Sequence, residues 1–229
     1  MKCMSTYAAV VLQFGLDVAV APRASSQTET STRSNSIAVE ADAISYFIGG
    51  YSAIVNLSLR NGFQAAFGMG RYDVPSFLLE GDDNYDTARW EATVTSVQVF
   101  RAGYRFKGPL RNGPALAAVV LNQNWHLRSA PLGGETRFRT LSVGLSGGYY
   151  FHLGKHFYIY PTAAFTHNDV TSGSTSVNGT DYKVEEWGPN ASVHVGWEWR
   201  PKAGAILLVC RNVCRSMAAD GYHADRWCP

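Results

Sequence analysis

A strict alternation of apolar and polar residues constrains this chain more than any other feature. In residues 51–60, YSAIVNLSLR, every second side chain is apolar, and Asn61-Gly62 then marks a tight turn. Successive side chains of a β-strand point to opposite faces, so this period of two predicts a strand with two different surfaces. The same period returns around residues 63–70, 100–106, 115–126, 141–151, 157–166 and 191–200. The chain therefore predicts an all-β fold.

The connections between these segments alternate in length. Residues 61–62, 107–113 and 153–155 form short links, whereas 73–90, 128–136 and 168–186 are long and polar. Short turns at one end and long loops at the other are typical of an antiparallel up-and-down transmembrane β-barrel. This alternation also requires an upward strand before residue 50. Eight strands are therefore predicted, near residues 36–46, 50–60, 62–72, 92–106, 114–127, 137–152, 156–168 and 187–200.

The alternation is less clear in one segment and needs its two faces assigned in another. Between residues 91 and 106, Val97 and Val99 fall on the wrong face, and a β-bulge would restore the pattern. In residues 115–126, the apolar face is expected to hold Ala115, Ala117, Val119, Leu121 and Trp125, opposite Asn122, Asn124 and His126.

Composition favours a barrel that is apolar outside. Charged residues make up 17% of the 229, and the mean hydropathy is −0.12. The polar faces are rich in Gly, Ser, Thr and Asn, which suits a crowded lumen better than a soluble surface. No stretch approaches the ~20 apolar residues that a transmembrane helix needs. A soluble, lipocalin-like barrel with the faces reversed remains an alternative.

Aromatic residues on the apolar face collect beside the short turns. They would form one girdle at a membrane interface, where amphipathic rings are favoured. Tyr51, Trp125 and Phe165 lie toward the long loops and could form the other girdle. The girdle beside the short turns comprises Phe63, Tyr104, Phe106, Tyr149, Phe151, Phe157, Trp197 and Trp199.

With this pattern, and the ending SVHVGWEW at residues 192–199, the chain resembles the family of small bacterial outer-membrane β-barrels of the OmpA-like and OmpW-like kind. The resemblance covers about residues 37–200. It implies a Gram-negative outer-membrane location, outer-membrane lipid and the barrel-assembly machinery as partners, and a monomer. The family ends its barrel near a terminal aromatic residue, whereas this chain continues for 29 residues.

The remaining segments have other compositions. Residues 1–24 are expected to be a signal peptide, with an apolar stretch at 7–12 and Ala-Val-Ala at 19–21. Residues 25–35 predict a disordered linker. The barrel would occupy 36–200, and 201–229 would be an atypical tail, disordered or frame-shifted. Its Cys210, Cys214, Cys228 and His223 make a weak zinc pattern, read here as unpaired cysteines.

Charges on the polar faces are the candidate functional residues. They are expected to line the lumen, where buried charges need partners. A salt-bridge network that plugs the barrel is the favoured interpretation, and a path for a small polar solute is the alternative. These interior residues are Glu40, Asp42, Arg60, Arg101, Arg105, His194 and Glu198.

A structural, passive-transport or surface-interaction role is therefore expected, with no enzymatic activity, cofactor, metal or nucleic-acid partner. The net charge of +2 offers no field for a polyanion. A lipid A-modifying enzyme is the alternative, because His126 and Ser129 are the nearest match to a hydrolytic pair. The acidic run at residues 82–86 is expected to be a solvated loop rather than a Ca²⁺ site.

Overall fold

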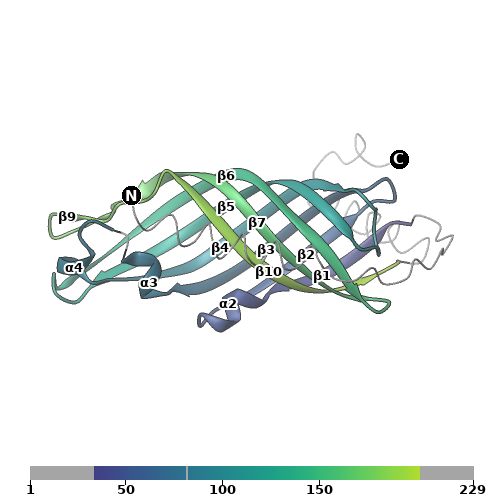
Figure 1. Cartoon of the computed structure of the whole chain (residues 1–229). Coiled ribbons are helices and arrows are strands. Elements are labelled where there is room, and N and C mark those ends of the chain that lie inside the picture. The colour runs from purple at the N-terminus through teal and green to yellow at the C-terminus, as the bar shows by residue number, and fades with distance from the viewer. Residues whose placement is uncertain (1–33, 81, 202–229) are drawn as a thin grey trace, which may run out of the picture.

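Eight antiparallel strands close into one barrel in the computed structural model, which describes residues 34–80 and 82–201 (Figure 1). Each strand pairs with its neighbours in the chain, and β1 pairs with β10 to close the ring. The predicted up-and-down barrel of eight strands is thus confirmed. The barrel strands are β1 (Ser36–Asp42), β2 (Tyr51–Ser58), β3 (Phe63–Val74), β4 (Trp90–Arg105), β5 (Gly113–Ser129), β6 (Gly134–Leu153), β7 (Phe157–Gly173) and β10 (Trp187–Trp199).

The register sets the tilt of the strands. A row of paired residues that starts at Ile37 and runs around the barrel through the other strands arrives at Pro189 of β10. Across the closure, Ile37 pairs directly with Trp199, which lies ten residues after Pro189. With eight strands, this stagger corresponds to a tilt of about 40°, within the usual range for barrels. A lumen of this size is just wide enough for side chains to fill.

The barrel is apolar outside and polar inside. Leu145 is 62% exposed and Phe67 is 53% exposed, whereas Glu40 and Glu198 are almost completely buried. A soluble barrel has the opposite arrangement. On β6 the outward residues are uncharged from Leu153 to Leu141, which corresponds to a height of roughly 30 Å along the barrel axis once the tilt is included. This height matches the hydrocarbon core of a bilayer.

The two ends of the barrel differ. The turn end carries the connections 59–62, 106–112 and 154–156, together with Ser36 and Trp199. The loop end carries residues 75–80, 82–89, 130–133 and 174–186. Figure 1 shows α3 (Ser76–Leu79), α4 (Tyr85–Ala88) and the hairpin of β8 (Ser176–Val177) and β9 (Thr180–Asp181) gathered there.

The first strand is shorter than predicted. It was expected to reach residue 46, but β1 ends at Asp42, and α2 (Ala43–Phe47) follows. Asp42 is the N-cap of α2, and its side chain accepts hydrogen bonds from Ile44 N and Ser45 Oγ at 3.1 and 2.9 Å. A capping aspartate satisfies free N–H groups of the first helical turn, which explains the change of structure at this residue.

The predicted bulge lies in β4. The register of β4 shifts between Val94 and Ser96 against β5, so Thr95 is the additional residue. Against β3, the shift lies opposite Arg71, between Gly70 and Tyr72. The bulge lets Val94 and Val97 both face the interior, so Val97 and Val99 stay on the polar face, and the expectation that the bulge would return them to the apolar face is wrong.

The faces of β5 are reversed relative to the prediction. Ala115, Ala117 and Val119 are buried inside the barrel, and Leu116 is 50% exposed outside it. Residues 115–121 are apolar on both faces, so alternation could not distinguish them. For the same reason, the predicted place of Trp125 in the outer girdle is wrong, because it packs inside against Phe138.

The link predicted at 128–136 is mostly strand. β5 and β6 continue beyond the apolar band and join through a short turn at 130–133. Their polar outward residues face water there, and the sequence therefore resembled a loop. The predicted signal peptide, most of the linker and nearly all of the tail lie outside the described residues. Within the described part of the chain, no helix is long and apolar enough to cross a membrane.

Candidate functional site

The charged residues expected in the lumen gather around two buried carboxylates near the turn end. Glu40, Arg101, Arg105, His194 and Glu198 are all buried in the interior. Asp42 is half-buried and caps α2 instead. The prediction for Arg60 needs correction, because β2 ends at Ser58 and Arg60 is exposed in the following turn.

Glu40 of β1 forms the first centre. Its Oε2 pairs with Arg101 Nη2 at 2.5 Å, and its Oε1 accepts hydrogen bonds from Tyr158 Oη at 2.6 Å and Asn56 Nδ2 at 2.7 Å. His194 Nδ1 lies 3.8 Å from Oε2. Strands β1, β2, β4, β7 and β10 thus meet at one carboxylate.

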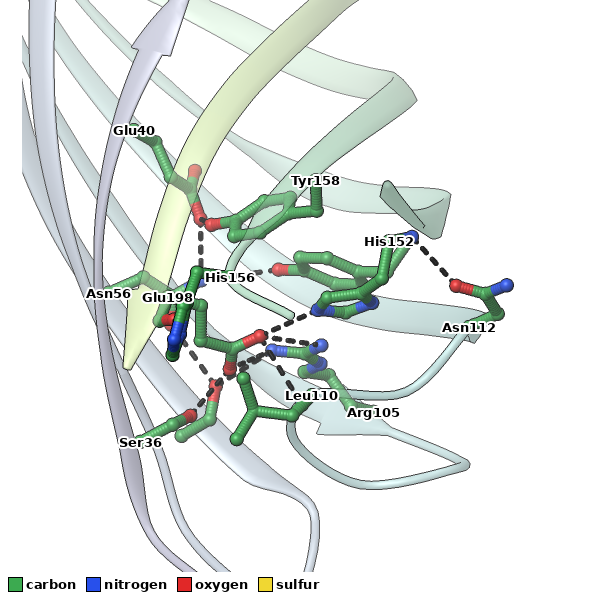
Figure 2. A network of polar contacts seen from close by, with 12 residues as sticks. Ser36, Glu40, Asn56, Arg105, Leu110, Asn112, His152, His156, Tyr158 and Glu198 are labelled. Atoms are coloured by element: carbon green, nitrogen blue, oxygen red, sulfur yellow. Dashed lines mark hydrogen bonds and ion pairs between the residues drawn. The ribbon is translucent and has the colours of Figure 1, made fainter. Parts of the chain in front are cut away.

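Glu198 of β10 forms the second centre, which Figure 2 shows beside the first. Its Oε1 accepts hydrogen bonds from Ser36 Oγ at 2.5 Å and Arg105 Nη1 at 2.7 Å. Its Oε2 lies 2.8 Å from His152 Nε2 and accepts the backbone N–H of Leu110 at 3.2 Å. Both oxygens of Glu198 are therefore occupied, by groups from three strands and one turn.

Tyrosines join the two centres. Tyr150 donates to Gln64 Oε1 at 2.9 Å and accepts from Asn56 Nδ2 at 3.1 Å. Its ring stacks on Tyr160 with centroids 4.0 Å apart, and the Arg105 guanidinium lies 3.8 Å from the centroid of Tyr150. A cation over an aromatic face is favourable when both are desolvated.

Small residues make room for these rings. A Cβ added to Gly196 would meet the Tyr158 ring at 2.4 Å, and one added to Gly148 would meet the Tyr160 ring at 2.5 Å. Ala115 of β5 packs in the same buried cluster as Tyr150. This packing explains why β5 turns its alanines inward, because larger side chains would not fit beside three tyrosines.

The network links the strands of the barrel wall to one another, and it does not hold a reactive group exposed to solvent. Glu40 and Arg101 are compensated by each other, and so are Glu198 and Arg105. An unpaired charge in this position would be very costly, so each member depends on its partner. With Tyr150 and Tyr158 fully buried, side chains fill this part of the lumen.

A small polar cavity of about 190 Å³ lies nearer the loop end, lined by Tyr72, Gln123, Trp125, Thr140 and Asn190, among others. This volume corresponds to about six water molecules. Its polar groups largely bond one another: Gln123 Nε2 donates to Tyr72 Oη at 2.7 Å, and Trp125 Nε1 donates to Thr140 Oγ1 at 2.9 Å. The cavity therefore does not present a set of free donors.

The loop end carries a folded cap, defined as residues 75–80, 82–89, 130–133 and 174–186. Leu79, Ala88 and Val177 from these segments pack with Trp90 and Leu127 in one buried apolar cluster. The cluster joins segments that are far apart in the chain. The long connections are therefore packed against one another rather than extended into solvent.

Asp82 is the polar centre of the cap. Its Oδ1 accepts from Asn84 N at 2.9 Å and Trp90 Nε1 at 3.1 Å, and its Oδ2 accepts from Lys183 N at 2.8 Å. The expectation of a purely solvated acidic loop is therefore wrong for Asp82. Burial, with Asp82 and Glu185 nearby, raises the pKa of Tyr182 to about 12, so this ring stays neutral.

The hydrolytic pair considered from the sequence is not assembled. Ser129 is buried and donates to the carbonyl of Ala88. His126 points outward, contrary to the inward position expected for it, and lies 3.1 Å from Glu135. Within the described residues, no group of three or more His, Cys, Asp or Glu side chains could hold a metal ion.

The girdle residues lie where the sequence placed them, on strands or turns at the turn end. Phe63 contacts Tyr104 with centroids 5.6 Å apart, and Tyr104 contacts Phe106 at 5.4 Å. Tyr149 packs on Phe151 at 4.5 Å. Phe157 and Trp197 are paired across β7 and β10, and Trp199 faces Ile37 across the closure.

Sequence reasoning did not single out Tyr150, Tyr158, Tyr160 or His152 as site residues. The signal was present, because all of them fall on the polar face of their alternating strands. A buried tyrosine hydroxyl usually finds a hydrogen-bond partner, as those of Tyr150 and Tyr158 do.

Comparisons with known proteins concern the fold alone. No protein-family model and no curated protein matches the chain. The N-terminal β-barrel domain of Pseudomonas aeruginosa OprF is similar, with 15% identity, a TM-score of 0.47 and coverage of 73% of this chain and 98% of that chain. Neisserial surface protein A has 14% identity, a TM-score of 0.39 and coverage of 73% and 95%. A major outer membrane protein from Thermus thermophilus has 11% identity, a TM-score of 0.48 and coverage of 72% and 99%.

Two of these structures are described as a β-barrel domain and a major outer membrane protein, and the eight-stranded barrel of this chain is confirmed by its own strand pairing. Such identities carry no information about activity.

Proposed function

We propose that this chain is an integral protein of the bacterial outer membrane with a structural role, in which a barrel closed to solutes anchors the folded cap at the membrane surface. The observation that carries the proposal is the inversion of polarity. Large apolar side chains such as Leu145 and Phe165 are more than half exposed, while two Arg–Glu pairs are buried inside. A continuous exposed apolar band is unfavourable in water and favourable in lipid.

The bilayer also explains why the barrel is closed. In hydrocarbon, no water can satisfy the free N–H and C=O groups of an unpaired strand edge. Pairing of β1 with β10 removes that edge along their shared length. Outer membranes of Gram-negative bacteria are where such barrels occur, so outer-membrane lipid and the barrel-assembly machinery are the proposed partners. The proposed state is a monomer.

The contents of the lumen favour a structural role over transport. Arg105, Glu198 and Tyr150 cross the interior in direct contact, and their side chains are nearly inaccessible. A solute path would require these charge-assisted contacts to break, and such contacts are the strong ones in a site of low dielectric constant.

Fractionation and gel migration test the proposal. The full chain should be found in the outer-membrane fraction, and the unheated protein should migrate differently from the boiled protein, because a closed barrel resists detergent unfolding. Recovery in the soluble fraction, with no difference in migration, would overturn the membrane assignment.

Planar-bilayer recording tests the closed lumen separately. Purified, correctly folded protein should give no steady open-channel current. Regular channel openings from folded protein would replace the structural role with passive transport, while leaving the membrane assignment intact.

A further inference from the structure

The outer surface of β5 and β6 changes abruptly from apolar to cationic. Along β6, the outward residues Leu145, Val143 and Leu141 are followed at once by Arg139 and Arg137, which are exposed. The change coincides with the top of the apolar band described above. If the band is embedded in lipid, as the proposed function requires, these guanidinium groups lie at the level of the outer headgroups.

The arginines are held in place by neighbouring strands. Arg139 pairs across the sheet with Asn124, and its Nε donates to Asn124 Oδ1 at 3.0 Å. Arg137 pairs with His126, and Arg128 of β5 lies opposite Glu135. The Nε contact fixes the plane of the Arg139 guanidinium and leaves its terminal nitrogens for another acceptor.

The acidic groups nearby lie closest to histidines. His126 Nε2 lies 3.1 Å from Glu135, and His167 lies 3.1 Å from Glu186 and 3.3 Å from Asp169. Among the residues that the structure describes, no ion pair joins a carboxylate to the side chain of Arg128, Arg137 or Arg139. The arginine patch, defined as Arg128, Arg137 and Arg139, therefore makes no ion pair with a carboxylate, although Glu91 and Glu135 lie opposite Arg128 on the neighbouring strands.

We propose that the arginine patch binds the phosphate group of a lipid in the outer leaflet. This inference rests on the proposed membrane location. The lipid's acyl chains would lie against Leu141, Val143 and Leu145, and its phosphate would face Arg137 and Arg139. An arginine guanidinium matches a phosphate because its planar donors can bond two oxygens at once. The arginine patch thus binds the phosphate end of the lipid, and the apolar band binds the acyl end of the same molecule.

The test compares the wild type with the double variant Arg137→Gln/Arg139→Gln, using the full chain purified in a neutral detergent. The probe is bisphosphorylated lipid A, and lipid A without its phosphates serves as the second ligand. Each arginine near a membrane surface contributes about fivefold in affinity for anionic lipid. Retention of phosphorylated lipid A, measured by native mass spectrometry, should therefore be about 25-fold weaker in the variant. The dephosphorylated lipid should bind both proteins equally.

A matched control removes two positive charges at the turn end. Arg60 and Lys155 are exposed there, so Arg60→Gln/Lys155→Gln should retain phosphorylated lipid A like the wild type. Equal retention by the Arg137/Arg139 variant, or equal weakening in the control, would overturn the proposal. Displacement of the lipid by inorganic phosphate alone would also overturn it, because the patch would then be a site for free phosphate.

The outcome can be separated from the fate of the proposed function. Heat-modifiable migration must be intact in the wild type and both double variants, which shows that each has folded as a membrane barrel. Loss of this behaviour in the wild type rejects the membrane location. Normal migration with unchanged lipid retention in the Arg137/Arg139 variant rejects the arginine patch alone.

Discussion

At the scale of single residues, Glu198 is the side chain whose loss is expected to reduce stability most. It accepts hydrogen bonds from Ser36, Arg105 and the backbone of Leu110, and it lies beside His152. Its side chain is completely inaccessible. Breaking a buried ion pair by removing one partner leaves the other charge without compensation, which costs far more than the intact pair contributes.

We therefore expect Glu198→Gln to lower the free energy of unfolding by about 3–5 kcal/mol, because Arg105 would stay buried without a counter-charge. The measurement is urea unfolding of the barrel in detergent, followed by gel migration. Glu135→Gln is the control, since Glu135 is exposed and should lose less than about 1 kcal/mol. Similar losses in both variants would contradict the assignment of Glu198 to the buried network.

At the scale of strands, the bulge at Thr95 can be tested by deletion. Removing Thr95 gives β4 a regular alternation and keeps Val94 and Val97 on the interior face. Gln98, in contrast, is paired regularly with both neighbouring strands. Removing it moves one part of β4 to the wrong face, because a shift of one residue inverts every side chain beyond it. We expect the Thr95 deletion to fold and the Gln98 deletion to fail, as judged by heat-modifiable migration.

If both deletions folded equally well, the register of β4 would not depend on the bulge. Thr95 does donate to the carbonyl of Asn124 at 3.1 Å, so a modest loss of stability is expected in the tolerated deletion.

The cap can be tested through Asp82. Asp82→Ala removes an acceptor that serves Asn84, Trp90 and Lys183, and the indole N–H of the buried Trp90, left unsatisfied, costs about 1–3 kcal/mol. We expect trypsin to cleave after Arg89 and Lys183 at least about tenfold faster in the variant, because local opening becomes easier. The time course of limited proteolysis measures this.

Asp83→Ala is the control for the cap, since Asp83 is exposed in the same loop. An unchanged rate of cleavage in Asp82→Ala would show that apolar packing alone holds the cap.

The elements differ in how far the sequence could predict them. β2, β6, β7 and β10 have one polar and one apolar face, so their orientation follows from alternation. β5 has alanine or valine on both faces, and only contact with Tyr150 from the neighbouring strand selects the inner one. The length of β1 depends on the cap formed by Asp42, and the loop cap depends on contacts such as Val177 with Leu79 between distant segments.

The same reasoning applies to the site. That Glu40, Arg101, Arg105 and Glu198 face inward followed from alternation alone. Alternation could not show which carboxylate pairs with which arginine, because the pairing depends on the stagger of strands across the closed barrel. Arg60 shows the limit at strand ends, where the pattern continues for two residues after the strand has ended.

At the scale of the whole molecule, the apolar band predicts how the cost of a charge varies with height. Leu145 lies within the band, paired with Ala118 and Phe165, and Leu153 lies at its edge beside the turn end. An arginine on the lipid face costs about 2–4 kcal/mol near the middle of a bilayer and about 0–1 kcal/mol near the interface. We expect Leu145→Arg to be much more destabilising than Leu153→Arg in unfolding from lipid vesicles.

Both leucines are more than half exposed in the structure, so neither change disrupts internal packing. Equal costs at the two heights would mean that the band does not sit in hydrocarbon. Equal costs in neutral detergent would not test whether the band sits in hydrocarbon, so the two leucine variants are compared in lipid vesicles.

The pairing of the first strand with the last has a consequence for the assembly of the protein. Arg101 and Arg105 both project from β4, whereas Glu40 and Glu198 arrive from β1 and β10, at opposite ends of the sheet. In the closed barrel both ion pairs are buried. Pairing of β1 with β10 thus removes the free strand edges and encloses both ion pairs. The register in which β1 meets β10 therefore determines whether Glu198 reaches Arg105.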